Sequence, residues 1–492
     1  MPAETYQTST TLNELLQGFV DAPAIEIKGI ASDSRQLSQG YLFLAVKGAS
    51  QHGLEFVDAA VRAGVAAIVY DESTADAVPT EVGIPLLGVP QLAQHLGAIA
   101  ARYYAHPSTQ LAVFAVTGTN GKTTVASMIA QCLQRLDRRC AYLGTLNNEL
   151  TTPPPVELHG ILAEFRDDGA TEAAIEVSSH ALAQNRTDSV RIDTALFTNL
   201  SRDHLDYHAD MRDYGEAKAR LFIECNPSHS IINIDDEFAA QLAKRCVSDV
   251  TVVSADVSRA ADVRPYVFAK RVTAHNNGFD VDVQSSFGAG QFSLAMPGDF
   301  NVANALLTLA LLLHKGIAID AACGALSAVT APLGRMQAID GPRQAPAVYV
   351  DFAHTPDALQ AALQALRAHC NGRIWVVFGC GGDRDKGKRA LMGRVAQRLA
   401  DQVVVSSDNP RNEPTSSIID DIVAGLASPA AATIIEDRAT AIAWAINSAA
   451  AADIVLIAGK GHEQYQQIGA ERIPFSDQSV AAACLAARGE GE

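Results

Sequence analysis

The chain has 492 residues, of which 48% are hydrophobic and 19% are charged, a composition suited to packed cores rather than disorder. At about 150 residues per domain, this length predicts about three domains. The 38 Lys and Arg residues against 55 Asp and Glu residues give a net charge of −17, which disfavours nucleic acid as a partner because phosphodiester backbones need clustered positive charge. We expect anionic ligands to be held locally, by helix N-termini and a few basic side chains.

The cysteines and the N-terminus predict a cytoplasmic protein. The eight cysteines form no C-x-x-C pair, which is typical of reduced thiols. The opening residues MPAETYQTST contain neither a basic run nor an apolar segment, so no signal peptide is predicted. The apolar stretch Ala305–Leu313 is about half a membrane span in length, so no spanning segment is predicted either.

Residues 1–88 form the first predicted domain, a small α/β unit. Apolar segments at Tyr41–Val46 and Ala66–Tyr70 predict strands, and the alanine-rich stretch Phe56–Ala63 predicts a helix between them. The second predicted domain, residues 89–334, opens with the helical pattern Gln91–Tyr104.

Short apolar strands that alternate with helices indicate a parallel sheet covered on both faces. In the second domain the predicted strands are Leu111–Val116, Ala173–Val177, Thr194–Phe197 and Ser230–Asn233. In the third domain, residues 335–492, they are Ala347–Val350, Arg373–Phe378, Gln402–Val405 and Asp453–Ile457. Each strand of the third domain runs into a polar or glycine-rich turn, which is where ligands bind in open α/β sheets.

The strand Leu111–Val116 leads into Thr117-Gly-Thr-Asn-Gly-Lys-Thr-Thr124 and then into a helix. Glycines in such a loop let backbone N–H groups surround phosphate oxygens, the lysine reaches the β- and γ-phosphates, and a following threonine can bind Mg²⁺. The usual pattern has glycine where this chain has Val116, so the loop is a variant whose first glycine is Gly118.

This loop resembles the TGTNGKT signature of the Mur ligases and folylpolyglutamate synthetases, which are ATP-dependent amide ligases. The resemblance extends over nearly the whole chain, with at least eight motifs in family order. It implies an α/β fold of three domains: a central P-loop parallel-sheet ATPase domain between a small α/β N-terminal domain that binds the UDP-sugar and a Rossmann-like C-terminal domain that binds the acceptor amino acid. The implied ATP-binding residues of the loop are Gly118, Thr119, Asn120, Gly121, Lys122, Thr123 and Thr124.

Glu176 ends a predicted strand and His204 follows another, positions from which either side chain could bind a phosphate-bound cation or serve a structural role. Lys218, taken alone, reads as a lysine on a helix surface. In Mur ligases the matching Glu and His bind Mg²⁺, and the matching lysine is carbamylated by CO₂ to give a further carboxylate-like ligand. The resemblance therefore implies Mg²⁺ ligands at Thr123, Glu176, His204 and carbamylated Lys218. It implies catalytic roles for Lys122, Glu176, His204 and Lys218.

Several polar turns resemble the segments by which the Mur ligase that adds the third amino acid binds UDP-MurNAc-L-Ala-D-Glu. Those near the N-terminus could also be ordinary turns. Asn185 stands where the family commonly has a His or similar residue, a difference that we expect to be neutral. The implied contacts are Ser32, Ser34, His52, Gly53, Thr151, Thr152, Ser178, Gln184 and Arg186.

Asn301 and Asn304 fall one turn apart on one helix face, in a string that resembles the family's PGxFNxxN segment near adenine. Gly334-Arg-Met336 resembles the hinge that closes the central domain, and we expect closure there on binding of nucleotide and substrate. Asp351–Asp357 resembles DYAHTPD, but Phe352 lacks the tyrosine hydroxyl. The implied ATP contacts are Asn301, Asn304, Arg335, Asp351 and His354.

Asp408-Asn-Pro-Arg-Asn-Glu413 follows a predicted strand and carries an arginine, whose fork binds carboxylates bidentately. In Mur ligases that add meso-diaminopimelate, a DNPR motif holds the distal end of this acceptor, and lysine-adding relatives lack the arginine. Lysine has no second carboxylate, and Arg411 would repel its ammonium. The implied acceptor residues are Arg384, Asp408, Asn409, Pro410, Arg411, Gly459 and Glu463.

The resemblance thus implies an ADP-forming amide ligase that adds meso-diaminopimelate to UDP-MurNAc-L-Ala-D-Glu through an acyl phosphate, in peptidoglycan precursor synthesis. We expect a monomer that uses ATP and Mg²⁺. The alternatives are a lysine-adding ligase of the same type, a folylpolyglutamate synthetase, and a non-catalytic nucleotide switch.

Overall fold

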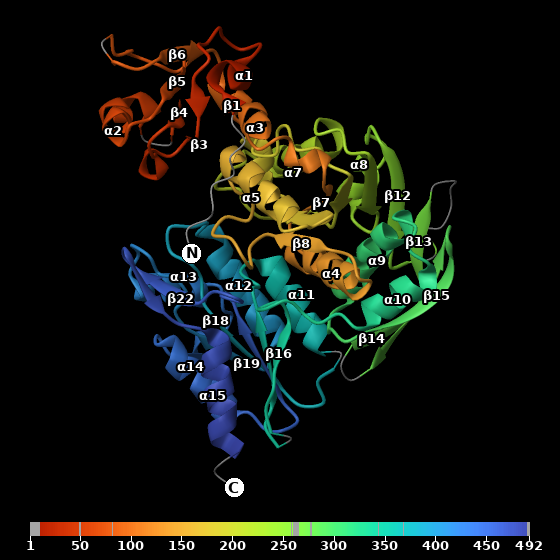
Figure 1. Cartoon of the computed structure of the whole chain (residues 1–492). Coiled ribbons are helices and arrows are strands. Elements are labelled where there is room, and N and C mark those ends of the chain that lie inside the picture. Colours follow the sequence, from red (N-terminus) through yellow and green to blue (C-terminus); the bar gives the residue numbers. More distant parts are fainter. Residues whose placement is uncertain are drawn as a thin grey trace. The chain divides into compact units, whose positions relative to one another are not determined.

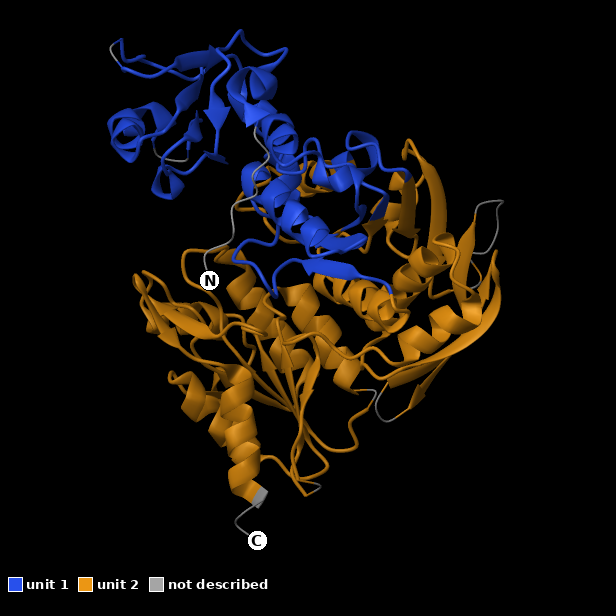
Figure 2. Ribbon diagram, in the orientation of Figure 1, with its two compact units in different colours: residues 1–115, 138–195, 220–228 blue, residues 116–137, 196–219, 229–492 orange. Residues whose placement is uncertain are grey.

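The structure is a computed structural model that describes residues 10–48, 51–80, 82–256, 258, 265–275, 278–342, 344–367 and 369–489. Most of the N-terminal segment used to predict the absence of a signal peptide, residues 1–9, lies outside the described residues. The chain divides into two compact units (Figure 2), composed of residues 1–115, 138–195 and 220–228 in unit 1 and residues 116–137, 196–219 and 229–492 in unit 2.

Unit 1 begins with the small α/β domain. Its four strands pair in parallel in chain order, with helices packed against them (Figure 1). The strands are β3 (Gly29–Ala31), β4 (Tyr41–Ala45), β5 (Ala67–Asp71) and β6 (Leu86–Val89). The other elements are β1 (Thr10–Thr11), β2 (Glu26–Ile27), α1 (Leu12–Leu16), α2 (Val57–Ala63) and α3 (Leu92–Tyr103). The two strands and two helices predicted here agree with β4, β5, α2 and α3 to within one residue at each end.

A nine-stranded sheet forms the centre of the chain, in the order β15-β14-β13-β12-β11-β10-β7-β9-β8. The boundary between the two units runs through two of its strands, β7 (Ala112–Thr117) and β10 (Thr194–Phe197). Unit 1 also holds β8 (Cys140–Leu143), β9 (Glu172–Glu176), α5 (Pro155–Asp167) and α6 (Ser179–Ala183). The strands predicted in this domain correspond to β7, β9, β10 and β11, with shifts of at most one residue.

The central part of unit 2 contains three antiparallel strands that the sequence analysis did not predict. They are β13 (Tyr266–His275), β14 (Gly278–Ser285) and β15 (Gly288–Leu294). β12 (Asp249–Ser254) joins them to β11 (His229–Asn233). The helices are α4 (Lys122–Arg135), α8 (Glu237–Leu242), α9 (Asp299–His314) and α10 (Ile319–Ser327). Most of α7 (Met211–Ile223) also belongs to unit 2, and its residues 220–223 belong to unit 1.

The C-terminal sheet has the order β16-β17-β21-β18-β19-β20, with only β16 antiparallel to its neighbour. Its strands are β16 (Gln337–Ile339), β17 (Ala347–Asp351), β18 (Ile374–Phe378), β19 (Gln402–Val405), β20 (Ala432–Ile434) and β21 (Ile454–Ala458). A separate two-stranded sheet is formed by β22 (Tyr465–Ile468) and β23 (Glu471–Pro474). Because β17, β21, β18 and β19 are parallel, the loops at their carboxyl ends lie along one edge of the sheet.

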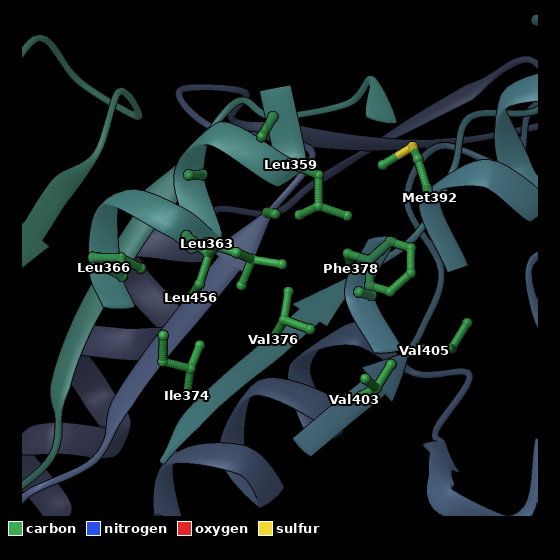
Figure 3. Close-up of a cluster of buried hydrophobic side chains, with 14 of the residues drawn as sticks. Leu359, Leu363, Leu366, Ile374, Val376, Phe378, Met392, Val403, Val405 and Leu456 are labelled. Carbon is green, nitrogen blue, oxygen red and sulfur yellow. The ribbon is translucent and has the colours of Figure 1, made fainter. Parts of the chain in front are cut away.

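Both faces of the C-terminal sheet are buried. Successive residues of a strand point to opposite faces, so in β18 Val376 and Phe378 join one core and Val377 joins the other. The first core (Figure 3) lies under α11 (Pro356–Arg367), α12 (Gly387–Leu399) and α13 (Thr415–Val423). The second lies under α14 (Arg438–Ser448) and α15 (Asp477–Gly489). This doubly covered parallel sheet is the predicted Rossmann-like arrangement.

Of the helices that the structure describes, none combines the length and the apolar character needed to cross a bilayer.

A fully buried ion pair holds the C-terminal sheet near the ends of two of its strands. Arg438 and Asp477, at the starts of α14 and α15, have no exposed side-chain surface and form two hydrogen bonds of 2.8 Å. The Arg438 guanidinium also donates to the carbonyls of Ser407 and Ala458. It therefore joins the residues that follow β19 to the last residue of β21.

We predict that Asp477→Asn lowers the free energy of unfolding of the C-terminal domain by about 3–5 kcal/mol, because it leaves a buried guanidinium without its counter-charge. Both tryptophans of the chain, Trp375 and Trp444, lie in this domain, so tryptophan fluorescence during urea denaturation measures it. Arg367→Gln, which removes the exposed pair with Asp401, is the control and should cost less than about 1 kcal/mol. Equal effects of the two substitutions would contradict the prediction.

Candidate active site

The glycine-rich loop lies between β7 and α4, the strand–loop–helix context that its sequence predicts. Gly118 has φ +147°, and a Cβ there would lie 1.9 Å from the Thr198 hydroxyl oxygen. Gly121 has φ +88°, and a Cβ there would lie 2.6 Å from Oδ1 of Asn304. Both positions thus require glycine, for conformation and for space.

A second loop, after β10, holds the glycine-rich loop in place. The backbone N–H groups of Thr119 and Asn120 donate to the carbonyl and the side chain of Asn199. The Thr198 hydroxyl donates to the carbonyl of Asn120. The sequence analysis gave these two residues no role, although Thr198 and Asn199 follow a predicted strand directly, which is the signal that could have identified them.

Two lysine amines converge on one carbonyl of the loop. Nζ of Lys122 donates to the carbonyl of Gly118 at 2.9 Å, and Nζ of Lys218 donates to the same oxygen at 2.8 Å. Lys218 is 1% exposed, so it is not the surface lysine that its sequence alone suggests. Burial, and then the positive charge of Lys122, hold the pKa of Lys218 well below its usual value. This lowering favours the neutral amine, which is the nucleophilic form of a lysine.

Tyr214 lies beside Lys218 and was missed by the sequence analysis. Its ring is 4.5 Å from Nζ of Lys218, and its hydroxyl donates to Oγ1 of Thr119 at 3.1 Å. Burial raises the pKa of this hydroxyl, so Tyr214 stays a neutral donor. Tyr214 and Lys218 are four residues apart on α7 and so share a helix face, which explains their contact.

Glu176 lies at the end of β9 in unit 1, and is 1% exposed. Its Oε1 accepts hydrogen bonds from the Tyr142 hydroxyl and from the backbone and hydroxyl of Thr145. A Cβ at Gly144 would lie 2.2 Å from this oxygen, so the backbone closes over the carboxylate. These contacts fix the carboxylate at the carboxyl end of its strand.

His204 lies in unit 2, in the loop after β10, with its Nε2 3.4 Å from the carboxylate of Asp203. Burial alone would raise the pKa of Asp203, but neighbouring His354, His204 and Lys388 lower it overall. Burial lowers the pKa of His354, with Lys388 adding to the effect and Asp203 opposing it. The C-terminal residues His354 and Lys388 thus act electrostatically on the loop that carries His204.

The residues predicted to contact ATP from α9 and from the C-terminal domain also lie in unit 2. Nδ2 of Asn304 donates to Oδ1 of Asn301, so these residues share one helix face as predicted. Nη2 of Arg335 donates to the Thr123 hydroxyl at 3.0 Å, and its guanidinium lies 4.5 Å from the centre of the Phe352 ring. The phenylalanine that replaces the family's tyrosine thus supports Arg335 by stacking.

Asp351 ends β17 and holds the Gly334–Met336 turn. Its carboxylate accepts from the backbone N–H groups of Met336 and Ala353, and burial raises its pKa. The turn itself is tight, since Gly334 has φ +66° and a Cβ there would lie 2.1 Å from the backbone nitrogen of His462. Closure of the domains about this turn stays a prediction.

The predicted acceptor residues lie together at the carboxyl edge of the C-terminal sheet. A Cβ at Gly381 would lie 2.8 Å from Nη1 of Arg411 and 3.6 Å from Cγ of Arg384. Nδ2 of Asn409 donates to Oε2 of Glu463 at 2.8 Å. A Cβ at Gly459 would lie 2.6 Å from Oδ2 of Asp408, and one at Gly382 would lie 1.9 Å from the carbonyl oxygen of Pro410. The structure therefore brings all seven together.

Buried cations that the sequence analysis missed support this cluster. Arg389 has no exposed side-chain surface and binds Glu413 and Asp421. The Glu413 carboxylate also accepts from the backbone N–H of Asp383, which joins the loop after β18 to the loop after β19. Lys460 is equally buried and lies against Asn409 and Glu463. The sequence analysis gave Arg389 and Lys460 no role.

The predicted UDP-MurNAc-dipeptide residues all lie in unit 1. Four of them form one network: the Thr152 hydroxyl accepts from the backbone of Ser178, and Arg186 binds the Thr152 carbonyl and the side chain of Gln184. Thr151 precedes this network directly. The others lie in the N-terminal domain, where Ser32 and Ser34 occupy a turn after β3, and His52 and Gly53 begin the short 3₁₀ helix Gly53–Phe56.

His52 fixes its turn from both ring nitrogens. Nδ1 accepts from the backbone N–H of Leu54, and Nε2 lies 3.1 Å from the Thr74 hydroxyl. A Cβ at Gly53 would lie 2.6 Å from Cα of Ala45, so no larger residue fits there.

Three family models match the chain. The model described as "Mur ligase family, catalytic domain" matches residues 26–104, "Mur ligase middle domain" matches 116–312, and "Mur ligase, glutamate ligase domain" matches 334–461. Together they cover more than half of the chain.

The chain belongs to the Mur ligase family. Members of this family catalyse ATP-dependent amide ligation, so the predicted enzyme class is confirmed. The predicted α/β fold with three domains and a central parallel sheet is confirmed as well. The boundaries of the domains at residues 88 and 334 stay predictions.

Named relatives are similar over almost the whole length. UDP-N-acetylmuramoyl-L-alanyl-D-glutamate–2,6-diaminopimelate ligase of Haemophilus influenzae (strain PittGG) is 42% identical over 469 residues, which are 93% of this chain and 96% of the relative. The ligase of the same name from Coxiella burnetii (strain RSA 493) is 42% identical over 470 residues, with the same coverage. A solved structure of a ligase of this name has a TM-score of 0.67 at 32% identity and covers 98% of this chain and 99% of its own.

We predict that Gly121→Ala weakens the binding of ATP to this Mur ligase at least tenfold, because the added methyl group collides with Asn304 and the residue has a positive φ. Calorimetric titration with ATP and Mg²⁺ measures the effect. Gly324→Ala is the matched control, since a Cβ there meets no atom within 4 Å. Unchanged ATP affinity in Gly121→Ala would show that this loop does not bind the nucleotide.

Proposed function

We propose that the chain adds meso-2,6-diaminopimelate to the D-glutamate of UDP-MurNAc-L-Ala-D-Glu, with conversion of ATP to ADP and phosphate, in peptidoglycan precursor synthesis. The observation that carries this proposal is the grouping of Arg411, Arg384, Asn409 and Glu463 at the carboxyl edge of the C-terminal sheet. The names of the relatives at 42% identity support the same acceptor. A monomeric state and a cytoplasmic location stay predictions.

The charges of this group match the distal end of diaminopimelate, which carries one carboxylate and one ammonium. Arg411 follows β19, and its Nη1 already donates to the carbonyl of Gly382, which holds the guanidinium in place. We propose that this fork binds the distal carboxylate and that Glu463 binds the distal ammonium. L-lysine lacks the carboxylate and would leave Arg411 without its counter-charge, so it should be a poor acceptor.

The chemistry proposed is activation of a carboxylate followed by amide formation. An oxygen of the D-glutamate side chain attacks the γ-phosphorus of ATP, ADP leaves, and an acyl phosphate forms. The free amine of diaminopimelate then attacks the acyl carbon, and the tetrahedral intermediate expels phosphate. Lys122 would offset charge on the transferring phosphoryl group, and the protein's main contribution would be placement and charge neutralisation.

The residues for Mg²⁺ are suited to that ion. Hydroxyl, carboxylate, imidazole and carbamate ligands leave room for water and phosphate oxygens, as Mg²⁺ requires. We propose that Thr123, Glu176, His204 and carbamylated Lys218 hold it, where it would neutralise phosphate charge. Among the residues that the structure describes, no three His, Cys, Asp or Glu side chains cluster as ligands. Glu176 belongs to unit 1 and the others to unit 2, so their joint site stays a prediction.

The dipeptide substrate is assigned to unit 1. We propose that Thr151, Thr152, Ser178, Gln184 and Arg186 bind the peptide part, and that Ser32, Ser34, His52 and Gly53 bind the UDP part. The Thr152–Arg186 network supplies a fixed guanidinium for an anionic substrate.

The test of this function is phosphate release with ATP, Mg²⁺ and UDP-MurNAc-L-Ala-D-Glu, with meso-diaminopimelate or L-lysine as acceptor. We expect release with diaminopimelate, and release at least a hundredfold slower with L-lysine. In Arg411→Ala, kcat/KM for diaminopimelate should fall at least a hundredfold, because the charge-assisted contact with the distal carboxylate is lost. Comparable rates with L-lysine would overturn the role of Arg411 but keep the ligase.

The folylpolyglutamate synthetase alternative predicts another outcome of the same assay. Such an enzyme would release phosphate only with a folate and glutamate, and it would not need the N-terminal domain that the Mur ligase model matches at residues 26–104. The other alternative, a non-catalytic nucleotide switch, disagrees with the confirmed enzyme class.

We predict that Lys218 reacts with CO₂, because burial lowers the pKa of its amine and so favours the neutral form, which alone is nucleophilic. Protein equilibrated with ¹³C-bicarbonate should show one carbamate carbon signal. This signal should weaken as the pH falls and the amine becomes protonated. Lys218→Arg keeps a long side chain with hydrogen-bond donors but cannot form the carbamate, so it should lack the signal and lose at least a hundredfold in ligase activity. The same signal in both proteins would assign it to another amine.

A further inference from the structure

The acceptor cluster contains a buried cation with no assigned role. The side chain of Lys460 is fully buried in the Gly459–Gly461 turn that follows β21. Its Nζ lies 2.8 Å from Oε2 of Glu463 and 2.9 Å from Oδ1 of Asn409. It is 3.9 Å from Oδ1 of Asp408. Because it has no exposed surface, Lys460 can act on an acceptor only through these neighbours.

Lys460 fixes which way the Asn409 amide points. A lysine ammonium has three donors and no acceptor, so the amide atom that faces it must be the oxygen. The backbone N–H of Gln467 donates to the same oxygen at 2.9 Å. The NH₂ group of Asn409 is thereby directed to Oε2 of Glu463, at 2.8 Å.

These contacts give the two carboxylate oxygens of Glu463 different hydrogen bonding. Oε2 accepts from both Lys460 and Asn409, whereas no hydrogen bond to Oε1 links it to another described residue. The side chain is partly exposed, at 21%. Glu463 thus offers one oriented carboxylate oxygen to a cationic group that enters the cluster.

We propose that Lys460 is a positioning residue that sets acceptor specificity, by holding Glu463 and Asn409 in the arrangement that receives the distal ammonium of the acceptor. This inference rests on the proposed function, because it needs an acceptor with a charged distal end. Without Lys460, Glu463 loses its internal counter-ion, and only the backbone N–H of Gln467 is left to hold the Asn409 oxygen. An ammonium would then meet a misplaced carboxylate, whereas a distal carboxylate at Arg411 would be unaffected.

Two acceptors separate these effects: meso-diaminopimelate, and 2-aminopimelate, in which a hydrogen replaces the distal amino group. In Lys460→Met, we expect kcat/KM for meso-diaminopimelate to fall about tenfold to a hundredfold, mostly through KM, as for the loss of a hydrogen bond to a charged group. The value for 2-aminopimelate should change less than threefold, and the KM values for ATP and the dipeptide should stay the same. Equal losses with both acceptors would overturn the proposal, since a merely structural role would affect both.

Control variants distinguish a loss of acceptor recognition from a folding defect in Lys460→Met. Lys244→Met removes an exposed lysine beyond α8 and should leave all constants unchanged. If Lys460→Met melts at a lower temperature than the native protein, Lys460→Gln is tested as well. This variant keeps a hydrogen-bond donor without the charge, and it should recover part of kcat/KM for meso-diaminopimelate. Where 2-aminopimelate is too slow an acceptor to measure, the double variant of Lys460→Met and Glu463→Gln decides. The proposal is supported if the loss of kcat/KM in the double variant is smaller than the two single losses combined. It is refuted if the two losses are additive.

The outcomes also separate this inference from the proposed function. If the native protein releases no phosphate with meso-diaminopimelate, the proposed function fails. If the native protein is active and Lys460→Met is equally active with meso-diaminopimelate, only the role of Lys460 fails.

Discussion

The convergence of Lys122 and Lys218 on the carbonyl oxygen of Gly118 is the interaction on which the central site depends. Burial makes the charged form of Lys218 costly, and the positive charge of Lys122 adds to this cost, so both lower the pKa of Lys218. The neutral amine that this lowering favours is the form that reacts with CO₂ to give a carbamate. The same geometry keeps Lys122 in the loop where a phosphate would lie.

A different constraint governs the acceptor side, where parallel strands end in loops rich in buried charge. Arg438 joins the residues after β19 to the end of β21, Arg389 joins the loops after β18 and β19 through Glu413, and Lys460 orients Asn409 and Glu463. Removing one partner of such a buried ion pair is costly, so these contacts allow few alternative loop conformations. The acceptor site is thus built on fixed ions rather than on an apolar pocket.

The elements that the sequence predicted best are those with continuous apolar runs. β10 and β19 agree with prediction at both ends. After a polar first residue, each is a run of buried apolar residues, as expected for a strand covered on both faces. β14 was missed for the opposite reason. In it, buried Val281 and Val283 alternate with more exposed residues, a pattern typical of a strand with one covered face.

The candidate residues divide in a similar way. Loop glycines and motif arginines could be found because their chemistry depends on residue type and spacing. Lys218 and Lys460 could not be recognised as buried, because the cost of burying a lysine is offset by partners distant in sequence, such as Gly118 for Lys218 and Asn409 for Lys460. The contacts of Arg335 with Thr123 likewise join residues more than two hundred positions apart, beyond what spacing alone reveals.

The most direct test of a ligase that works through an acyl phosphate is the path of oxygen. UDP-MurNAc-L-Ala-D-Glu labelled with ¹⁸O in both oxygens of the D-glutamate side-chain carboxylate is turned over with ATP, Mg²⁺ and meso-diaminopimelate. The account predicts that each phosphate released carries one ¹⁸O atom and that the amide carbonyl of the product retains the other. Unlabelled phosphate would show that water, not the substrate carboxylate, attacks ATP, and would contradict the assignment of this chain's site to amide ligation.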